Sequence, residues 1–258
     1  MTWNIEGLRN AEGNLHIDLF SGYDVVILME TFLTSDWSAQ RLYSVHSFAE
    51  QSTMGRPKRG ISCLLSPRMA KFIVIHKTSN ILGVKTPYGI FLGVYFQPEL
   101  QAVDVIDSLS RAISAVPRSE HLIIAGDLNC RIDQPTGKSM AVLNYLEGEG
   151  LTLLSRKEDK TYLCHNGSST IDIFFSNLKG VKSCKTRTLQ SVTIRKHLPT
   201  ELTLILDSEF TQHSPQKTMI SRRLDTDKLQ CDLQKLPSIL EEIEKGISTE
   251  QQRIWRTS

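Results

Sequence analysis

Short hydrophobic runs, rich in β-branched residues and too short for helices, recur along the chain and predict buried strands. The clearest are Tyr23–Glu30 and His121–Asn129, and each passes directly from apolar residues into polar ones at its C-terminal end. Further runs bounded by Gly, Pro or Ser predict strands at Gly60–Leu65, Lys71–His76, Ile81–Lys85, Gly89–Phe96, Thr170–Phe175 and Glu201–Leu206.

Helical periodicity occurs in two segments, Leu100–Val116 and Ser139–Glu149. Many strands with few helices between them favour a layered α/β fold, a two-layer β-sandwich flanked by helices, over strict alternation of strands and helices.

The strand pattern stops near Asp207, so residues 1–207 are predicted to form one domain. Residues 208–217 form a polar stretch that is typical of a linker. Beyond it, Leu224–Ile247 has apolar residues at helical spacing interrupted by Pro237, so residues 208–258 are predicted to be a linker and a helical extension.

Composition narrows the possible partners and compartments. The 30 basic and 28 acidic residues give a net charge of +2, so a nucleic-acid-binding surface would have to be local. No apolar stretch approaches the length of a membrane span, and the first residues lack the order of a signal peptide, which predicts an intracellular protein. The five cysteines have scattered spacings without a CxxC pair and are predicted to be reduced thiols.

Polar groups that can perform chemistry occur at strand ends and in tight turns. Asp127 and Asn129 are two positions apart, so in an extended segment both side chains would point into one cleft. The whole set, in chain order, is Trp3–Leu8, Glu30–Thr31, Tyr95, Gly126–Asn129, Ser169–Asp172 and His197–Pro199.

In order and spacing, these groups resemble the endonuclease/exonuclease/phosphatase superfamily, which includes apurinic endonucleases, deoxyribonuclease I, inositol phosphatases and the endonuclease domains of non-LTR retrotransposons. The resemblance covers about residues 2–207 and implies the deoxyribonuclease I-like, four-layer α/β/β/α fold. Hydrolysis of a phosphodiester needs charge neutralisation and an activated water. A site of carboxylate and amide oxygens suits Mg²⁺ or Mn²⁺ better than zinc.

The resemblance also implies roles for the metal-side residues. Glu30 would be the principal metal ligand, with Asn4 beside the metal. Asp127 would orient or deprotonate the attacking water, and Asn129 would donate a hydrogen bond to the phosphate. Taken singly, each could instead be an ordinary turn or surface residue.

Three further residues complete the implied site. Asp172 would orient His197, and an imidazole held by a carboxylate can offer a charged hydrogen bond to a phosphate oxygen. Tyr95 matches the family's tyrosine near the phosphate, although tyrosine is also a normal strand residue. We expect six of these residues to converge in one cleft at one end of the sandwich: Asn4, Glu30, Asp127, Asn129, Asp172 and His197.

One position departs from the family pattern, because Lys196 stands where the family usually has aspartate. Three interpretations are open: Lys196 contacts phosphate, or it points away and activity is merely reduced, or the domain is a decayed copy. The second is favoured. A lysine there should weaken metal retention and strengthen phosphate binding.

Basic residues predict the substrate surface. Arg56, Lys58 and Arg59 lie in one loop, and further basic residues, Lys179, Lys182, Lys185 and Arg187, lie between Asp172 and His197. Such loops would contact a nucleic-acid backbone without regard to sequence, unless they are ordinary solvated surface.

The function predicted from the sequence is therefore a metal-dependent phosphodiester hydrolase, a DNA endonuclease of retroelement type that makes backbone nicks. By resemblance, its partners are DNA and a reverse transcriptase region in a longer polyprotein, with a nuclear location when it acts on DNA. The alternatives are a catalytically weakened domain that binds nucleic acid or protein, and a phosphatase of the same superfamily.

Overall fold

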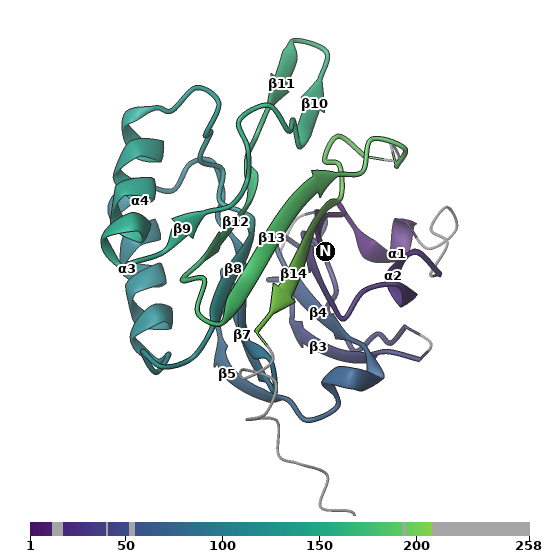
Figure 1. Ribbon diagram of the computed structural model, residues 1–258. Helices are drawn as coiled ribbons and strands as arrows, with labels where there is room; N and C mark the ends of the chain where they lie inside the picture. Colours follow the sequence, from purple (N-terminus) through teal and green to yellow (C-terminus); the bar gives the residue numbers. More distant parts are fainter. Residues whose placement is uncertain (12–17, 40, 52–54, 193–194, 208–258) are drawn as a thin grey trace, which may run out of the picture. The chain divides into compact units, whose positions relative to one another are not determined.

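Two six-stranded sheets pack face to face in the computed structural model, which describes residues 1–11, 18–39, 41–51, 55–192 and 195–207 (Figure 1). The first sheet has the order β13 (Val181–Thr188), β14 (Thr200–Leu206), β1 (Thr2–Asn4), β2 (Val25–Met29), β4 (Ile61–Leu65) and β3 (Tyr43–Ser47). The second has the order β5 (Ile73–Lys77), β6 (Ile81–Thr86), β7 (Gly89–Tyr95), β8 (Leu122–Asp127), β12 (Asp172–Ser176) and β9 (Thr152–Leu153). A separate hairpin pairs β10 (Tyr162–Cys164) with β11 (Gly167–Ser169).

Helices cover the outer faces of the sheets. Helices α3 (Ala102–Ser114) and α4 (Gly137–Gly148) pack on the second sheet, and the short helices α1 (Leu8–Ala11) and α2 (Asp18–Ser21) lie beside the first (Figure 1). A 3-10 turn, Pro67–Met69, follows β4. The predicted sandwich flanked by helices is confirmed. The linker and helical extension predicted for residues 208–258 lie outside the described residues.

Three hydrophobic layers hold this arrangement together. Between the sheets, Ile27 and Met29 of β2 belong to the same buried cluster as Ile123 and Ala125 of β8. Because alternate residues of a strand point to opposite faces, Val26 and Leu28 join a second cluster under α1 and α2. The third cluster lies under α3 and α4. Burial on both faces explains why the strongest hydrophobic runs in the sequence are the central strands.

Each sheet contains one parallel pair at its centre, β1–β2 in the first and β7–β8 in the second. A parallel pair needs a crossover connection. Helices α1 and α2 lie on the connection between β1 and β2, and α3 lies on the connection between β7 and β8. Both strands of a parallel pair end at the same edge of the sheet. The C-terminal ends of four strands therefore carry the predicted site residues Asn4, Glu30, Tyr95 and Asp127.

Four of the predicted thiols fall on described residues, and all four are free. Cys63 and Cys130 are buried, whereas Cys164 and Cys184 are exposed. Cys231 lies outside the described residues. Among the described helices, none is both long enough and apolar enough to cross a membrane.

A substitution at Gly126 tests how closely β8 packs beside β7. Gly126 has φ +146°, and a Cβ atom there would lie 2.0 Å from the carbonyl oxygen of Val94. We expect Gly126→Ala to lower the free energy of unfolding by about 3 kcal/mol or more, because both the contact and the backbone angle oppose a side chain. Gly148→Ala is the control, since nothing lies within 4 Å of its Cβ position. Chemical denaturation measures both, and equal stability of the two variants would contradict the close approach of β7 and β8.

Candidate active site

The two sheets meet through Asn4 and Asp127. Asn4 ends β1 and Asp127 ends β8, and each is 1 % exposed. Asn4 Nδ2 donates to Asp127 Oδ2 over 3.1 Å, and Asn4 Oδ1 accepts from the backbone amide of Glu6. These two hydrogen bonds fix the orientation of the Asn4 side chain. The bond to Asp127 also holds that carboxylate in place at this end of the sandwich.

His197 approaches this carboxylate from the segment before β14. It lies three residues before β14, and its Nδ1 is 2.9 Å from Asp172 Oδ2. Its other nitrogen, Nε2, lies 3.9 Å from Asp127 Oδ2. Asp172 and Asp127 are directly opposite each other on β12 and β8. The imidazole therefore lies between two buried carboxylates.

This arrangement shifts the protonation equilibria of both groups. Burial alone would lower the pKa of His197, but Asp172, and then Asp127 and Glu6, outweigh it and raise the pKa to about 9. Burial, followed by the neighbouring charge of Asp172, raises the pKa of Asp127 to about 7. His197 is thus a charged donor at neutral pH, and Asp127 is a base that can gain and lose a proton there.

Glu30 and Tyr95 form a second link between the sheets. Glu30 follows β2 in a left-handed backbone conformation, φ +49°, and Tyr95 ends β7 directly beside Asp127 in register. The Tyr95 hydroxyl donates to Glu30 Oε1. Burial, and then the negative charge of Glu30, raise the pKa of Tyr95. The phenol consequently stays a hydrogen-bond donor over the whole physiological pH range.

Asn129 completes the group. Its backbone, at φ +48°, turns so that its amide donates to Asp127 Oδ1 over 2.9 Å. Its side-chain Nδ2 donates to the carbonyl of Phe96 over 2.8 Å, which leaves the second amide hydrogen for another acceptor. Contacts thus link Asn4, Asp127, Asn129, Asp172 and His197, with Tyr95 and Glu30 adjoining. The roles expected for these residues stay predictions.

Oxygen donors at this position fit a divalent cation. The ligand atoms of Asp127, Asp172 and His197 lie within 4.8 Å of one another. The carboxylate of Glu30 is linked to this group through Tyr95, the strand neighbour of Asp127. Even with His197 protonated, three carboxylates leave excess negative charge, and the buried Asp172 Oδ1 has no hydrogen-bond partner among the described residues. Hard oxygen ligands of this kind suit Mg²⁺ or Mn²⁺. Because Nδ1 of His197 is paired with Asp172 and the imidazole is protonated at neutral pH, His197 is suited to donate hydrogen bonds, and the carboxylate oxygens are the candidate ligands of an ion.

The predicted substrate-binding residues differ in exposure. Arg56 and Lys58 are exposed, and the Arg56 guanidinium lies 4.7 Å over the ring of Phe32, two residues after Glu30. Lys196 is also exposed, and its carbonyl accepts a hydrogen bond from the amide of Leu163. Arg59 is largely buried and makes several intramolecular contacts. The strand β13 carries Lys182 toward the far end of β14, so Lys182 lies away from His197.

Several neighbours of the site were not recognised from the sequence. Trp3 Nε1 donates to the carbonyl of His197 over 2.9 Å, and the ring of Tyr162 lies 4.8 Å from the imidazole. Arg195 Nε donates to the carbonyl of Ile5 over 3.1 Å. Trp3 lies inside the first motif, which was a usable signal, whereas nothing in the local sequence distinguishes Tyr162.

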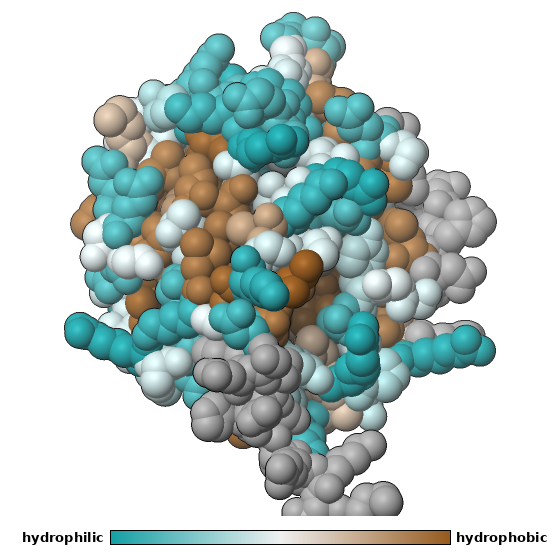
Figure 2. Space-filling model, in the orientation of Figure 1, coloured by the Kyte–Doolittle hydropathy of each residue, from teal (hydrophilic) through white to brown (hydrophobic). Residues whose placement is uncertain are grey.

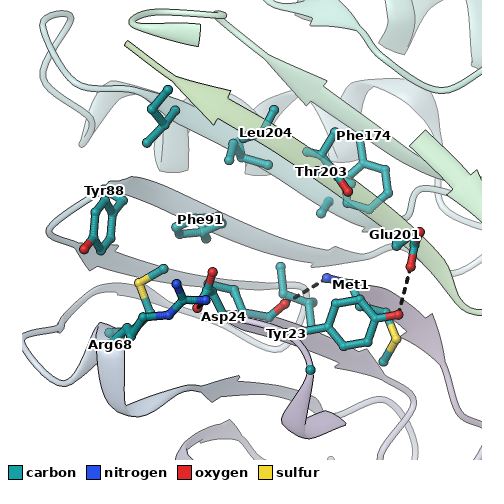
Figure 3. A pocket seen from close by; sticks show the side chains of 18 of the residues that line it. Met1, Tyr23, Asp24, Arg68, Tyr88, Phe91, Phe174, Glu201, Thr203 and Leu204 are labelled. Carbon is teal, nitrogen blue, oxygen red and sulfur yellow. Dashed lines mark hydrogen bonds and ion pairs between the residues drawn. The ribbon is translucent and has the colours of Figure 1, made fainter. Parts of the chain in front are cut away.

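A sizeable cavity lies away from these residues. It has a volume of about 910 Å³ and opens where β14 leaves β1, because these strands pair only at Thr2 and Thr200. Leu204, Phe91 and Phe174 are among the residues that line it, as Figure 3 shows, and Figure 2 shows a hollow with a hydrophobic floor near the middle of this face. It is at the opposite end of β2 from Glu30. None of the predicted site residues lines it.

A family model described as endonuclease-reverse transcriptase matches residues 90–201. No curated protein matches the chain. The matched segment includes Tyr95, Asp127, Asn129, Asp172 and His197 but begins after Asn4 and Glu30.

Solved structures extend the likeness to the whole sandwich. The endonuclease domain of TRAS1, a telomere-specific non-LTR retrotransposon, is 15% identical with a TM-score of 0.61 over 80% of this chain and 95% of that chain. An AP endonuclease from Archaeoglobus fulgidus is 12% identical with a TM-score of 0.62 over 80% and 98%. The 3′ phosphatase NExo from Neisseria, bound to a product DNA hairpin, is 12% identical with a TM-score of 0.60 over 80% and 98%. At these identities the likeness is one of fold.

The pairing of His197 with Asp172 can be tested by titration without assuming any activity. In Asp172→Asn the carboxylate that raises the pKa of His197 is gone while burial, which lowers it, remains. We expect the pKa of His197 to fall by at least about two units, equivalent to ~2.7 kcal/mol of lost interaction. Nuclear magnetic resonance titration of the imidazole in the presence of a chelator measures it. His76, far from Asp172 in the sheet order, is the internal control, and an unchanged His197 would refute the pairing.

Proposed function

We propose that this chain is a divalent-metal-dependent phosphodiesterase of the endonuclease/exonuclease/phosphatase superfamily that nicks the DNA backbone, and the fold and the matching family model support this proposal. The observation that carries the proposal is the buried series Asp172–His197–Asp127–Asn4, in which each side chain contacts the next. The charged imidazole of His197 can act as an acid, and the neighbouring carboxylate of Asp127, whose pKa is raised, can act as a base.

The residues divide the work of hydrolysis as follows. Asp127 accepts a proton from water as the water oxygen attacks phosphorus and the bond from phosphorus to the leaving oxygen breaks. His197, held by Asp172, donates a charged hydrogen bond to a non-bridging phosphate oxygen, where negative charge increases. Asn129 offers its remaining amide hydrogen to the same group. The phenol of Tyr95 fixes the carboxylate of Glu30.

Glu30 and Asn4 would hold Mg²⁺ or Mn²⁺, with Asp127 adjacent. When bound, the cation neutralises phosphate charge and stabilises the leaving oxyanion. It also relieves the repulsion among the carboxylates, so we expect metal binding to lower the pKa of Asp127.

DNA is proposed as the substrate, and the retroelement type as the class of enzyme. The matching family model and the fold of TRAS1 support this choice, as does the exposure of Arg56 and Lys58 near Glu30. Exposed cations of this kind give affinity for phosphates that depends on salt and not on sequence. A reverse transcriptase region in a longer protein is part of the same proposal, with action on DNA in the nucleus.

Plasmid nicking tests the proposal directly. We expect supercoiled plasmid to become open circles with Mg²⁺ or Mn²⁺ and to stay supercoiled with a chelator. Glu30→Gln keeps the shape but removes the charge of the ligand, so nicking should fall by about 10²-fold or more. The Arg111→Ala variant, changed on the outer surface of α3, should nick as the parent does. Metal-independent nicking, or full activity in Glu30→Gln, would refute the metal site.

Lys196 decides between an active and a weakened domain. Its exposed side chain favours the interpretation that it reduces activity without abolishing it. A parent that binds DNA but cleaves no plasmid would support the binding-only alternative. Release of phosphate from a 3′-phosphorylated hairpin without plasmid nicking would support the phosphatase.

Replacing this lysine by the family's usual residue gives a second prediction. Lys196→Asp adds negative charge near the metal and removes positive charge near the phosphate. We expect more nicking at limiting Mg²⁺ and slightly weaker, less salt-sensitive DNA binding, with the salt slope smaller by about one. A magnesium titration and a salt titration measure the two effects. If the dependence on magnesium is unchanged, Lys196 lies beyond the influence of the metal.

A further inference from the structure

The backbone around Arg59 holds the turn that follows Glu30. The carbonyl of Arg59 accepts from the amide of Phe32 over 3.1 Å, and the carbonyl of Gly60 accepts from the amide of Thr31 over 3.1 Å. The approach is close, because a Cβ atom on Gly60 would lie 2.7 Å from the hydroxyl of Thr31. Arg59, with φ +67°, and Phe32, with φ +54°, both adopt left-handed conformations. Non-glycine residues keep such conformations where the surrounding structure requires them.

The side chain of Arg59 extends from this turn to the other sheet. Its Nη1 donates to Glu50 Oε1 over 2.6 Å and to Ser79 Oγ over 3.1 Å. Its Nη2 donates to Gln97 Oε1 over 2.6 Å. Gln97 follows β7 by two residues and lies next to Phe96, whose carbonyl accepts from Asn129. One planar guanidinium therefore connects the Glu30 turn with the segment that carries Tyr95.

These contacts leave Arg59 poorly suited to bind a phosphate. Its side chain is 18% exposed, and its charge is paired with Glu50. Its Nε has no hydrogen-bond partner among the described residues but is buried out of reach of a phosphate in solution. A phosphate would have to displace acceptors that are already well placed. Arg56, three residues earlier, is exposed and has no ion-pair partner among the described residues.

We propose that Arg59 is a positioning residue that sets the distance between Glu30 and Tyr95 across the end of the sandwich, and that it does not bind the substrate. The hydrogen bond from the guanidinium fixes the position of Gln97 relative to the turn that follows Glu30. Tyr95, two residues before Gln97, is thereby placed where its hydroxyl reaches the carboxylate of Glu30. A lysine at position 59 would keep the positive charge but lose the planar set of donors that reaches Glu50 and Gln97 in two directions. The inference rests on the proposed nuclease function, because rate is its main readout.

The test separates the rate from the affinity in Arg59→Ala and Arg59→Lys. We expect both variants to lower kcat for plasmid nicking by roughly 10- to 100-fold, since small misplacements of catalytic groups have effects of this size. The Kd for DNA in chelator and its salt dependence should stay within about two-fold of the parent in both. Arg56→Ala is the contrasting variant, in which Kd should rise and the salt slope fall by about one. Arg111→Ala should change none of these quantities.

The Gln97→Leu variant removes the hydrogen bond between Arg59 and Gln97 by changing the partner that follows the second sheet's strand β7. It leaves Arg59 and its charge in place, so it should lower kcat in the same way without affecting Kd. The inference is overturned if the Arg59 variants weaken DNA binding and reduce the salt slope while kcat at saturating DNA is retained. It is equally overturned if Arg59→Lys is as active as the parent, because charge alone would then suffice.

A parent that nicks no DNA at any metal concentration would refute the proposed function and leave this inference to a second measurement. Denaturant unfolding of Arg59→Ala, Gln97→Leu and the double variant gives the coupling between the two side chains. We expect the double variant to be clearly less destabilised than the sum of the single variants. Additive effects would show that the connection across the sandwich contributes nothing, and the inference would fail.

Discussion

A buried carboxylate without partners would destabilise any small domain, and the burial of Asp127 is the constraint on which the rest of this site depends. Leaving such a charge unpaired costs several kcal/mol, so its neighbours must compensate. Asn4, His197 and the amide of Asn129 do so from three different segments. Each partner needs its own support, which brings in Asp172 and Trp3. The polar network and the hydrophobic sandwich therefore specify each other.

The contacts that make up the site are also the contacts that join the two sheets at this end. Asn4 with Asp127, Tyr95 with Glu30, and His197 with Asp172 each pair a residue of the first sheet, or of a segment next to it, with one of the second. A change in sheet spacing would alter all three contacts together. The geometry of this candidate site is thus a property of the whole sandwich and cannot be assigned to one loop.

The central strands could be predicted from the sequence for a physical reason, whereas the candidate site residues were inferred from a family resemblance and their roles stay predictions. Strands buried on both faces must be apolar throughout, and polar residues directly after them stand out, as Glu30 and Asp127 do. The edge strands β3 and β13 were missed because water reaches one side of them, so their sequences are mixed. The contacts of Arg59 could not be predicted either. A basic residue in a loop has the same local signature whether it faces solvent or, as here, reaches across to another sheet.

Because β14 is only weakly attached to β1, the parts of the first sheet differ in how cooperatively they unfold. Beyond Thr200, β14 pairs only with β13, and the cavity replaces the packing that a neighbouring strand would supply. Segments with few buried contacts open locally at a lower free energy than the whole domain. The β13–β14 ribbon can therefore fluctuate at its distal end while Trp3 and Asp172 hold His197 at the proximal end. Motion at the distal end of this ribbon therefore leaves the imidazole of His197 in place.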